Sequence, residues 1–210
     1  MQQPLRVPPK VPARVVVLAS GTGSLLRSLL EATGGDDYPA RIVAVGVDRD
    51  CPAVDIAASA AVPSYAVRLR DHPDREAWDK AMTEATTDQE PDLIVAAGFM
   101  KILGPHFLSR FMGRIINTHP ALLPAFPGAH AVPDALQYGV KVTGCSVHLV
   151  DAGTDTGPLL AQEAVPVLDD DDEASLHERI KVVERRLLVD VLAAVATRGV
   201  TWTGRKATVG

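Results

Sequence analysis

The chain has 210 residues, of which 47% are hydrophobic and only 4% aromatic, and its formal net charge is −5. This length and apolar content suit one large α/β domain, in which a sheet is covered by helices. The acidic balance argues against a general nucleic-acid binder, which needs a basic surface, and no apolar run reaches membrane-spanning length.

The cysteines indicate the redox compartment, and the two ends of the chain indicate the domain limits. Cys51 and Cys145 are the only cysteines and form no CxxC pattern, so we expect no disulfide framework and a reduced, cytoplasmic setting. Residues 1–12 are rich in proline and lack the apolar stretch of a signal peptide, which predicts a flexible N-terminal arm. Residues 200–210 have little pattern and are expected to be a C-terminal tail, leaving 13–199 as a single domain.

Strand and helix patterns alternate along the first two thirds of the chain. Short apolar or β-branched runs predict strands at 14–19, 41–47, 64–67, 91–97 and 114–118. Helical patterns lie at 25–32, 54–61, 74–90, 105–111 and 132–138. Asp74 is a suitable N-cap for the third of these helices. This order predicts a doubly wound, mostly parallel sheet with helices on both faces and ligands at the carboxyl ends of its strands.

The last third of the chain changes character. Two strand patterns follow each other closely at 143–150 and 159–167, so we expect an antiparallel edge of the sheet. The acidic run 169–173 is interpreted as a solvated helix start, where negative charge suits the positive end of the helix dipole. Apolar residues at helical spacing then predict a long amphipathic helix, through Leu176, Ile180, Val183, Leu187, Val191 and Val195.

A glycine-rich turn between the first strand and helix is the first candidate site. Gly21, Thr22, Gly23 and Ser24 would present backbone N–H groups at a positive helix end, which can seat a phosphate. No Gly-Lys-Ser/Thr follows, so the turn is not a P-loop, and Leu26 stands where a dinucleotide-binding turn has its third glycine. Taken alone, the turn favours anion binding only modestly over a tight turn that needs small residues.

Asn117 and His119 form the second candidate site, at the end of the fifth predicted strand. Residues i and i+2 of a strand share a face, and Pro120 keeps His119 extended. An amide donor beside an imidazole suits acyl transfer, in which Asn stabilises an oxyanion while His moves a proton or adds charge.

Two further stretches are less informative by themselves. Asp155 lies in an Asp- and Gly-rich loop after the strand at 143–150, where it could orient and charge His119, although a surface turn is the more common interpretation. His148, inside that strand, is expected to have a structural role or to act through its neighbours. The stretch 98–103 places Lys101 among apolar residues. Taken alone, this stretch is better explained as core residues plus one solvated lysine. No metal-ligand pattern and no GxSxG elbow is present.

Taken together, these motifs resemble the glycinamide ribonucleotide formyltransferases, a family of folate enzymes of purine synthesis, over about residues 14–190. The resemblance is carried, in order, by Ser20-Gly-Thr-Gly-Ser24, Asp74-Arg-Glu-Ala-Trp-Asp79, Ala97-Gly-Phe-Met-Lys-Ile-Leu103, Ile116-Asn-Thr-His-Pro-Ala-Leu-Leu-Pro124, Gly144-Cys-Ser-Val-His148 and Asp155-Thr-Gly-Pro158. The Asn-x-His-Pro stretch followed by Asp-x-Gly-Pro is its most specific part.

The resemblance implies a role for each matching residue. Catalysis falls to Asn117, His119 and Asp155. Substrate phosphate binding falls to Gly21, Thr22, Gly23, Ser24 and Arg75, and substrate amine or ribose binding to Glu184. The walls around the folate are formed by Met100, Lys101, Ile102, Leu103, Val150 and Asp151.

The implied reaction moves the formyl group of 10-formyltetrahydrofolate, a co-substrate, to the amine of 5'-phosphoribosylglycinamide by direct attack through a tetrahedral intermediate. The implied partners are small molecules, with no metal, nucleic acid or membrane, and a homodimer is compatible with the sequence. Three positions depart from the family pattern: Leu25 replaces a common Asn, Lys101 replaces Arg and so loses the bidentate fork, and Val132 falls where His is frequent.

Three other functions stay open at this point. A formyltetrahydrofolate hydrolase or a methionyl-tRNA formyltransferase would use the same trio, but each normally needs a further domain. A nucleotide-binding oxidoreductase would use Asp48 at the end of the second strand to bind ribose. Leu26 and the otherwise unexplained pair of Asn117 and His119 argue against it. A catalytically silent ligand sensor is the third.

Overall fold

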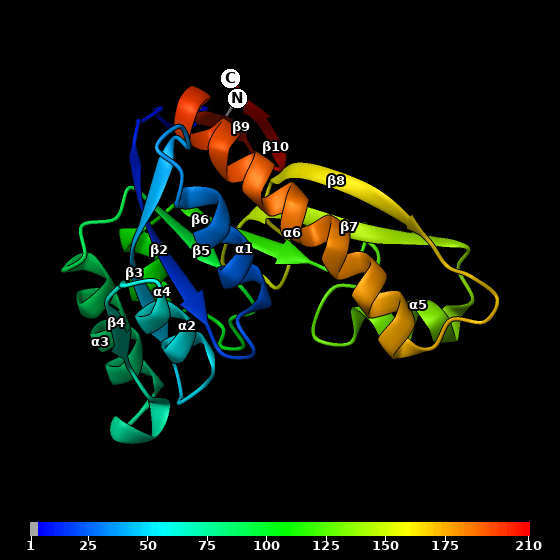
Figure 1. Cartoon of the computed structure of the whole chain (residues 1–210), viewed down its shortest axis with the longest axis horizontal. Coiled ribbons are helices and arrows are strands. Elements are labelled where there is room, and N and C mark those ends of the chain that lie inside the picture. Colours follow the sequence, from blue (N-terminus) through cyan, green and yellow to red (C-terminus); the bar gives the residue numbers. More distant parts are fainter. Residues whose placement is uncertain (1–3) are drawn as a thin grey trace.

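The structure is a computed structural model that describes residues 4–210. Its ten strands form one sheet in the order β1-β9-β10-β8-β7-β6-β5-β2-β3-β4 (Figure 1). The strands are β1 (Leu5–Val7), β2 (Ala13–Ala19), β3 (Ala40–Val47), β4 (Ser64–Ala66), β5 (Leu93–Ala96), β6 (Ile115–His119), β7 (Val142–Leu149), β8 (Leu159–Pro166), β9 (Val200–Thr203) and β10 (Lys206–Val209). The helices are α1 (Ser24–Thr33), α2 (Ala53–Ser59), α3 (Arg75–Thr87), α4 (Pro105–Arg110), α5 (Ala131–Tyr138) and α6 (Glu173–Arg198), with a 3₁₀ turn at Leu69–Asp71.

The expected doubly wound sheet is confirmed. Strands β4, β3, β2, β5 and β6 run parallel, and β7 and β8 then follow antiparallel to their neighbours. Asp74 caps α3, as expected, by accepting a hydrogen bond from the backbone N–H of Ala77 at 2.8 Å. Asp172, in the acidic run, caps α6 in the same way with Ser175, so these charges do begin a helix.

Two apolar layers lie on opposite faces of the sheet, as the alternation of strand side chains requires. Val15 and Val17 of β2 belong to a core formed with α1, α2 and α6, whereas Val16 and Leu18 belong to a second core formed with α3 and α4. A third, smaller cluster joins α5 and the start of α6 to β7 and β8.

Three neighbouring parallel strands bring the predicted site motifs to one edge of the sheet. Ala96 of β5 pairs with Leu18 of β2 on one side and with Asn117 of β6 on the other. The glycine-rich turn, the stretch after β5 and the Asn117–His119 pair therefore all leave the sheet at the same edge.

The two ends of the chain differ from expectation. Residues 5–7 of the expected arm form β1, which pairs with β9, and the expected tail folds as the hairpin β9–β10, with β10 beside β8. Trp202 packs against the larger core and lies directly over Gly113. These strands are too short to show a pattern, and they are stabilised by pairing with each other and by Trp202. Residues 1–3 of the expected arm lie outside the described residues, and the limits of the single domain stay a prediction.

Candidate active site

Asn117 and His119 lie in β6, in the middle of the sheet. The antiparallel partner β7 places His148 directly opposite Asn117, and the amide Nδ2 of Asn117 lies 3.2 Å from Nε2 of His148. His119 is only 4% exposed, and His148 only 2%. Neighbouring strands thus hold an amide and two imidazoles in a largely buried cluster, with ring positions fixed by packing.

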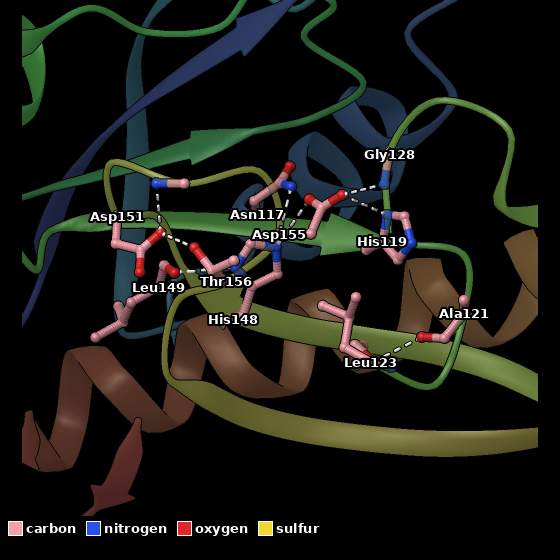
Figure 2. A network of polar contacts seen from close by, with 12 residues as sticks. Asn117, His119, Ala121, Leu123, Gly128, His148, Leu149, Asp151, Asp155 and Thr156 are labelled. Carbon is pink, nitrogen blue, oxygen red and sulfur yellow. Dashed lines mark hydrogen bonds and ion pairs between the residues drawn. The ribbon is translucent and has the colours of Figure 1, made fainter. Parts of the chain in front are cut away.

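Asp155 reaches this cluster from the loop between β7 and β8 (Figure 2). Its Oδ2 lies 3.3 Å from Nδ1 of His119 and accepts a hydrogen bond from the backbone N–H of Gly128 at 2.8 Å. Its Oδ1 lies 3.6 Å from Nε2 of His148. Asp155 has a positive φ of 54°, a conformation uncommon outside glycine, so the loop is shaped to aim this carboxylate inward.

The pKa of Asp155 is lowered to about 2, and the contact with His148 is the largest cause. The N–H of Gly128 and the nearby His119 lower the pKa further, while partial burial opposes them. Asp155 is therefore an anion at neutral pH and can hold a positive charge on a neighbouring imidazole.

His119 has an oxygen acceptor at each ring nitrogen. Its Nε2 lies 2.7 Å from the backbone carbonyl of Phe126, and its Nδ1 faces Asp155. An imidazolium can donate to both acceptors at once, whereas a neutral ring can satisfy only one. The loop after β6 therefore takes part in the site through its backbone, which no pattern in the sequence indicated.

The glycine-rich turn joins β2 to α1 at the same edge of the sheet. Gly23 has a positive φ of 74° and precedes the first helical residue, Ser24. A Cβ at Gly23 would lie 2.7 Å from Cδ1 of Ile56, so this position needs glycine for its conformation and for space. The first N–H groups of α1 have no partner within the helix, which leaves them free for an anion.

The stretch after β5 combines a fixed backbone with exposed side chains. Met100 and Ile102 are 67% and 69% exposed, whereas Leu103 is buried. Lys101 lies at the edge of ion-pair distance from the buried Asp48, with 4.0 Å between Nζ and Oδ2. Arg75 donates a hydrogen bond to the carbonyl of Ile102, which ties its guanidinium to this stretch.

The predicted residues of the β7–β8 loop and of α6 lie in different surroundings. Asp151 accepts hydrogen bonds from the N–H of Gly153 and the hydroxyl of Thr156, so it shapes the loop that carries Asp155. Val150 packs against the core on the α3–α4 face. Glu184 is 7% exposed, and burial raises its pKa against the opposing effect of a hydrogen bond with Thr118.

Glu184 does not lie on the same face of β6 as the predicted trio. Thr118 alternates with Asn117 and His119 along the strand and so points to the opposite face of the sheet. The structure therefore brings together Asn117, His119 and Asp155 and adds His148, while Glu184 approaches the strand from the α6 side.

Residues 13–192 match the family model of the formyl transferases. The chain belongs to the formyl transferase family. It is 73% identical over its whole length to a phosphoribosylglycinamide formyltransferase of Mycobacterium tuberculosis (strain ATCC 25618 / H37Rv), and it covers 97% of that protein. It is 38% identical to the human trifunctional purine biosynthetic protein adenosine-3 over 189 residues, which are 90% of this chain and 19% of that protein.

Solved structures agree with this membership. Glycinamide ribonucleotide transformylase 1 from Symbiobacterium toebii superimposes with a TM-score of 0.91 at 38% identity, covering 94% of each chain. Phosphoribosylglycinamide formyltransferase from Brucella melitensis gives a TM-score of 0.84 at 40% identity, covering 88% of this chain and 96% of the other.

Two of the three departures from the family pattern lie in this formyl transferase's interior. Leu25 is buried against the larger core beside the glycine-rich turn, and Val132 is buried on α5 against β7 and α6. Both side chains therefore contribute to packing. Leu25 has no polar atom to offer, so the donors of the glycine-rich turn are its backbone N–H groups and the hydroxyls of Thr22 and Ser24.

One recess of this formyl transferase lies away from the clustered polar residues. Its volume is about 500 Å³, and it lies at the opposite edge of the sheet, where it is lined by Lys10, Arg14, Thr87, Glu90, Pro91, Asp92, Arg110 and Phe111. None of the predicted site residues lines it, so we place the chemistry by the geometry of the polar cluster. Within residues 4–210, no group of three or more His, Cys, Asp or Glu is placed to hold a metal, and no helix is long and apolar enough to cross a bilayer.

Proposed function

We propose that this formyl transferase moves the formyl group of 10-formyltetrahydrofolate to the amine of 5'-phosphoribosylglycinamide, a step of de novo purine biosynthesis. The identity of 73% to a phosphoribosylglycinamide formyltransferase over the whole chain supports the choice of substrates. The observation that carries the chemistry is the convergence of Asn117, His119 and Asp155, with 3.3 Å between the imidazole and the carboxylate.

The reaction begins when the amine nitrogen attacks the formyl carbon. A C–N bond forms, the carbonyl electrons move to the formyl oxygen, and a tetrahedral oxyanion results. Asn117 has two N–H groups, one of which faces His148, so the other is available to the oxyanion. His119, whose two ring nitrogens face Asp155 and the carbonyl of Phe126, supplies positive charge beside the oxyanion, and Asp155 stabilises that charge.

The second half of the reaction breaks the bond between the formyl carbon and N10 of the folate. The attacking amine loses a proton, N10 gains one, and formylated product and tetrahydrofolate are released. In this proposal Asp155 keeps His119 charged during the first half and helps the proton reach N10, through a water molecule. The buried position of both side chains keeps this ion pair from being screened by bulk solvent.

Binding is assigned to the residues around this centre. The backbone of Gly21–Ser24 holds the phosphate, and Glu184, on the face of the sheet that α1 and α6 cover, serves the amine or ribose of the same substrate. The stretch 100–103 and residues 150–151 form the wall of the folate site. Because Arg75 binds the carbonyl of Ile102, we propose that its charge also acts near this wall, in addition to the phosphate role implied by the family resemblance.

We further propose that the protein acts in the cytoplasm on small molecules only, and as a homodimer. The two cysteines are unpaired, which suits a reducing compartment. Sedimentation of the purified chain tests the dimer, and a monomer at micromolar concentration contradicts it.

A coupled assay tests the proposed function. Formation of tetrahydrofolate is followed with 10-formyltetrahydrofolate in the presence and absence of 5'-phosphoribosylglycinamide. We expect product only when the amine is present. Equal rates with and without the amine, with release of formate, would show a hydrolase instead.

A pair of variants tests the role of Asn117. Replacing Asn117 by Ala removes one oxyanion donor and is expected to lower kcat about 100-fold or more. The matched control is Gln137→Ala, which removes an exposed carboxamide on α5 and leaves kcat unchanged. Near-normal turnover of a folded Asn117→Ala protein contradicts the assignment.

A further inference from the structure

Asp79 is a buried carboxylate to which the catalytic cycle assigns no role. It lies on the second turn of α3 and is 2% exposed. All hydrogen bonds of its carboxylate come from the backbone of one segment: Oδ1 accepts from the N–H of Gly104 at 3.0 Å and of Phe107 at 3.4 Å, and Oδ2 accepts from the N–H of His106 at 2.8 Å. Because a buried carboxylate is costly without such donors, this arrangement fixes the segment against α3.

The donors are the free N–H groups at the start of α4. Gly104 is the N-cap residue of this helix and has no side chain to cap it. Asp79 takes over that function from a different helix, and its negative charge suits the positive end of α4. A residue of α3 therefore caps the N-terminus of α4 and fixes its position.

Close packing at Gly104 shows how tightly the two elements fit. Gly104 has an ordinary extended backbone, with φ of −87° and ψ of 178°, so its conformation alone does not require glycine. A Cβ added there would lie 2.3 Å from Cγ of Asp79. Glycine is needed because the carboxylate occupies the space of a side chain.

The residues just before Gly104 are held in the same way. The N–H of Met100 donates to Oγ of Ser20 at 2.8 Å, and the carbonyl of Ile102 accepts from Arg75, one helical turn before Asp79 on α3. The side chains of Met100 and Ile102 nevertheless remain largely exposed. A fixed backbone with exposed apolar side chains is the arrangement that a preorganised binding wall requires.

We propose that Asp79 is a positioning residue for the folate: it anchors residues 99–103 through the start of α4, so that this segment keeps the shape that binds the pterin. The inference rests on the proposed function, in which this segment forms the folate wall. Asp79 itself does not touch substrate. Its loss should therefore weaken the binding of the folate selectively and leave the binding of phosphoribosylglycinamide unchanged.

The test measures KM for both substrates, and Kd for tetrahydrofolate alone, in Asp79→Asn and Asp79→Ala. We expect Asp79→Asn to raise the folate KM and the Kd about tenfold, as for the loss of one charge-assisted hydrogen bond, with KM for the amine within twofold of the wild type. The matched control is Asp74→Ala, which removes the N-cap of α3 but has no hydrogen bond to residues 98–107. It should lower Tm and leave both KM values unchanged.

A second variant reaches the same contact from the other side. Gly104→Ala pushes a methyl group against Asp79 and should raise the folate KM even if the Asp79 variants fail to fold. Asp79→Ala makes room for the methyl group of Gly104→Ala. The double variant should therefore raise the folate KM by less than the two single effects combined. Full additivity contradicts a shared contact.

Two outcomes overturn the inference: a folded Asp79→Asn protein with a folate KM within twofold of the wild type, or an equal rise in KM for both substrates. Ile102→Ala separates this failure from a failure of the proposed site. If Ile102→Ala raises the folate KM and Asp79→Asn does not, only the role of Asp79 is wrong. If neither variant changes the folate KM, the folate does not bind at this segment.

Discussion

Asn117 has two amide hydrogens, and its contact with His148 restricts how the amide can turn. Nδ1 of His148 lies 2.9 Å from the carbonyl of Leu149, which can only accept, so Nδ1 carries a hydrogen. Its Nε2 lies 3.2 Å from the amide Nδ2 of Asn117 and 3.6 Å from Oδ1 of Asp155. This contact fixes the rotation of the amide, so that its second N–H and its oxygen have defined directions.

The replacement His148→Ala tests this positioning. We expect kcat to fall about tenfold, less than for Asn117→Ala, because the oxyanion donor remains but is no longer held in one orientation. KM for both substrates should change little, since His148 is buried and does not reach them. Steady-state kinetics measure both quantities, and an unchanged kcat in a folded protein contradicts the role.

The lowered pKa of Asp155 links the site to stability. Because the folded-state pKa of about 2 lies below the ordinary value of 3.8, the charged carboxylate stabilises the folded protein fully above about pH 5. This stabilisation is lost as pH falls through 2. We expect Asp155→Asn to lower the free energy of unfolding by about 2 kcal/mol at pH 7.

Urea denaturation of the wild type and of Asp155→Asn between pH 7 and pH 2 measures this effect. The difference between the two proteins should stay constant down to about pH 5 and shrink below pH 4. A difference that does not depend on pH would mean that the variant loses packing and not an ion pair.

At the residue scale, the sequence indicated the trio but not its full surroundings. Asn117 and His119 share a strand face, which alternation predicts. The contact between His119 and the carbonyl of Phe126 depends on the backbone of a loop, and Phe126 has a positive φ of 51° that nothing in its side chain suggests. The pairing of His148 with Asn117 depends on the register of β6 against β7, which only the folded sheet fixes.

The turn between β2 and α1 illustrates how an element can require a single residue type. At Gly23 the positive φ of 74° makes any other residue strained, whereas at Gly21 a Cβ would meet nothing within 4 Å. We therefore expect Gly23→Ala to lower the free energy of unfolding by about 1–2 kcal/mol, the cost of a left-handed conformation for alanine. Gly21→Ala is the matched control and should leave Tm unchanged.

The same pair of variants bears on the phosphate seat. The distorted turn of Gly23→Ala should also raise KM for phosphoribosylglycinamide, because the N–H groups at the start of α1 would no longer point to one place. Thermal unfolding and kinetics measure the two effects separately. A stable Gly23→Ala protein with wild-type KM contradicts the assignment of this turn.

At the element scale, long periodic segments were predictable and interactions between elements were not. The alternation of apolar runs with helical patterns gave every strand from β2 to β8 and every helix to within a few residues. Asp79, however, lies in the middle of a helical pattern, where a carboxylate looks like a solvated surface group. Its burial follows from the approach of α4, which local sequence does not encode.

The whole molecule is completed by the two ends of the chain. The hairpin β9–β10 extends the sheet beyond β8, and Trp202 covers Gly113, two residues before β6 begins. These strands have three or four residues each and no alternation long enough to detect, so their structure arises from tertiary pairing.

Replacing Trp202 by Ala tests this contribution. We expect the free energy of unfolding to fall by about 2 kcal/mol, because a half-buried indole leaves a void beside the larger core. Val182→Ala, which shortens a side chain that is 60% exposed, is the control and should change stability little. Chemical denaturation measures both, and equal effects would contradict a packing role for the hairpin.

The pairing of β1 with β9 and of β9 with β10 places residues 5–7 and 206–209 only two strands apart, about 10 Å across the sheet. A short flexible linker could therefore join the two ends of the polypeptide. New termini could be opened between Gly35 and Asp36, in an exposed loop at the edge of the sheet remote from the trio. Such a circular permutant would keep every contact of the catalytic centre while changing the order in which the strands are synthesised.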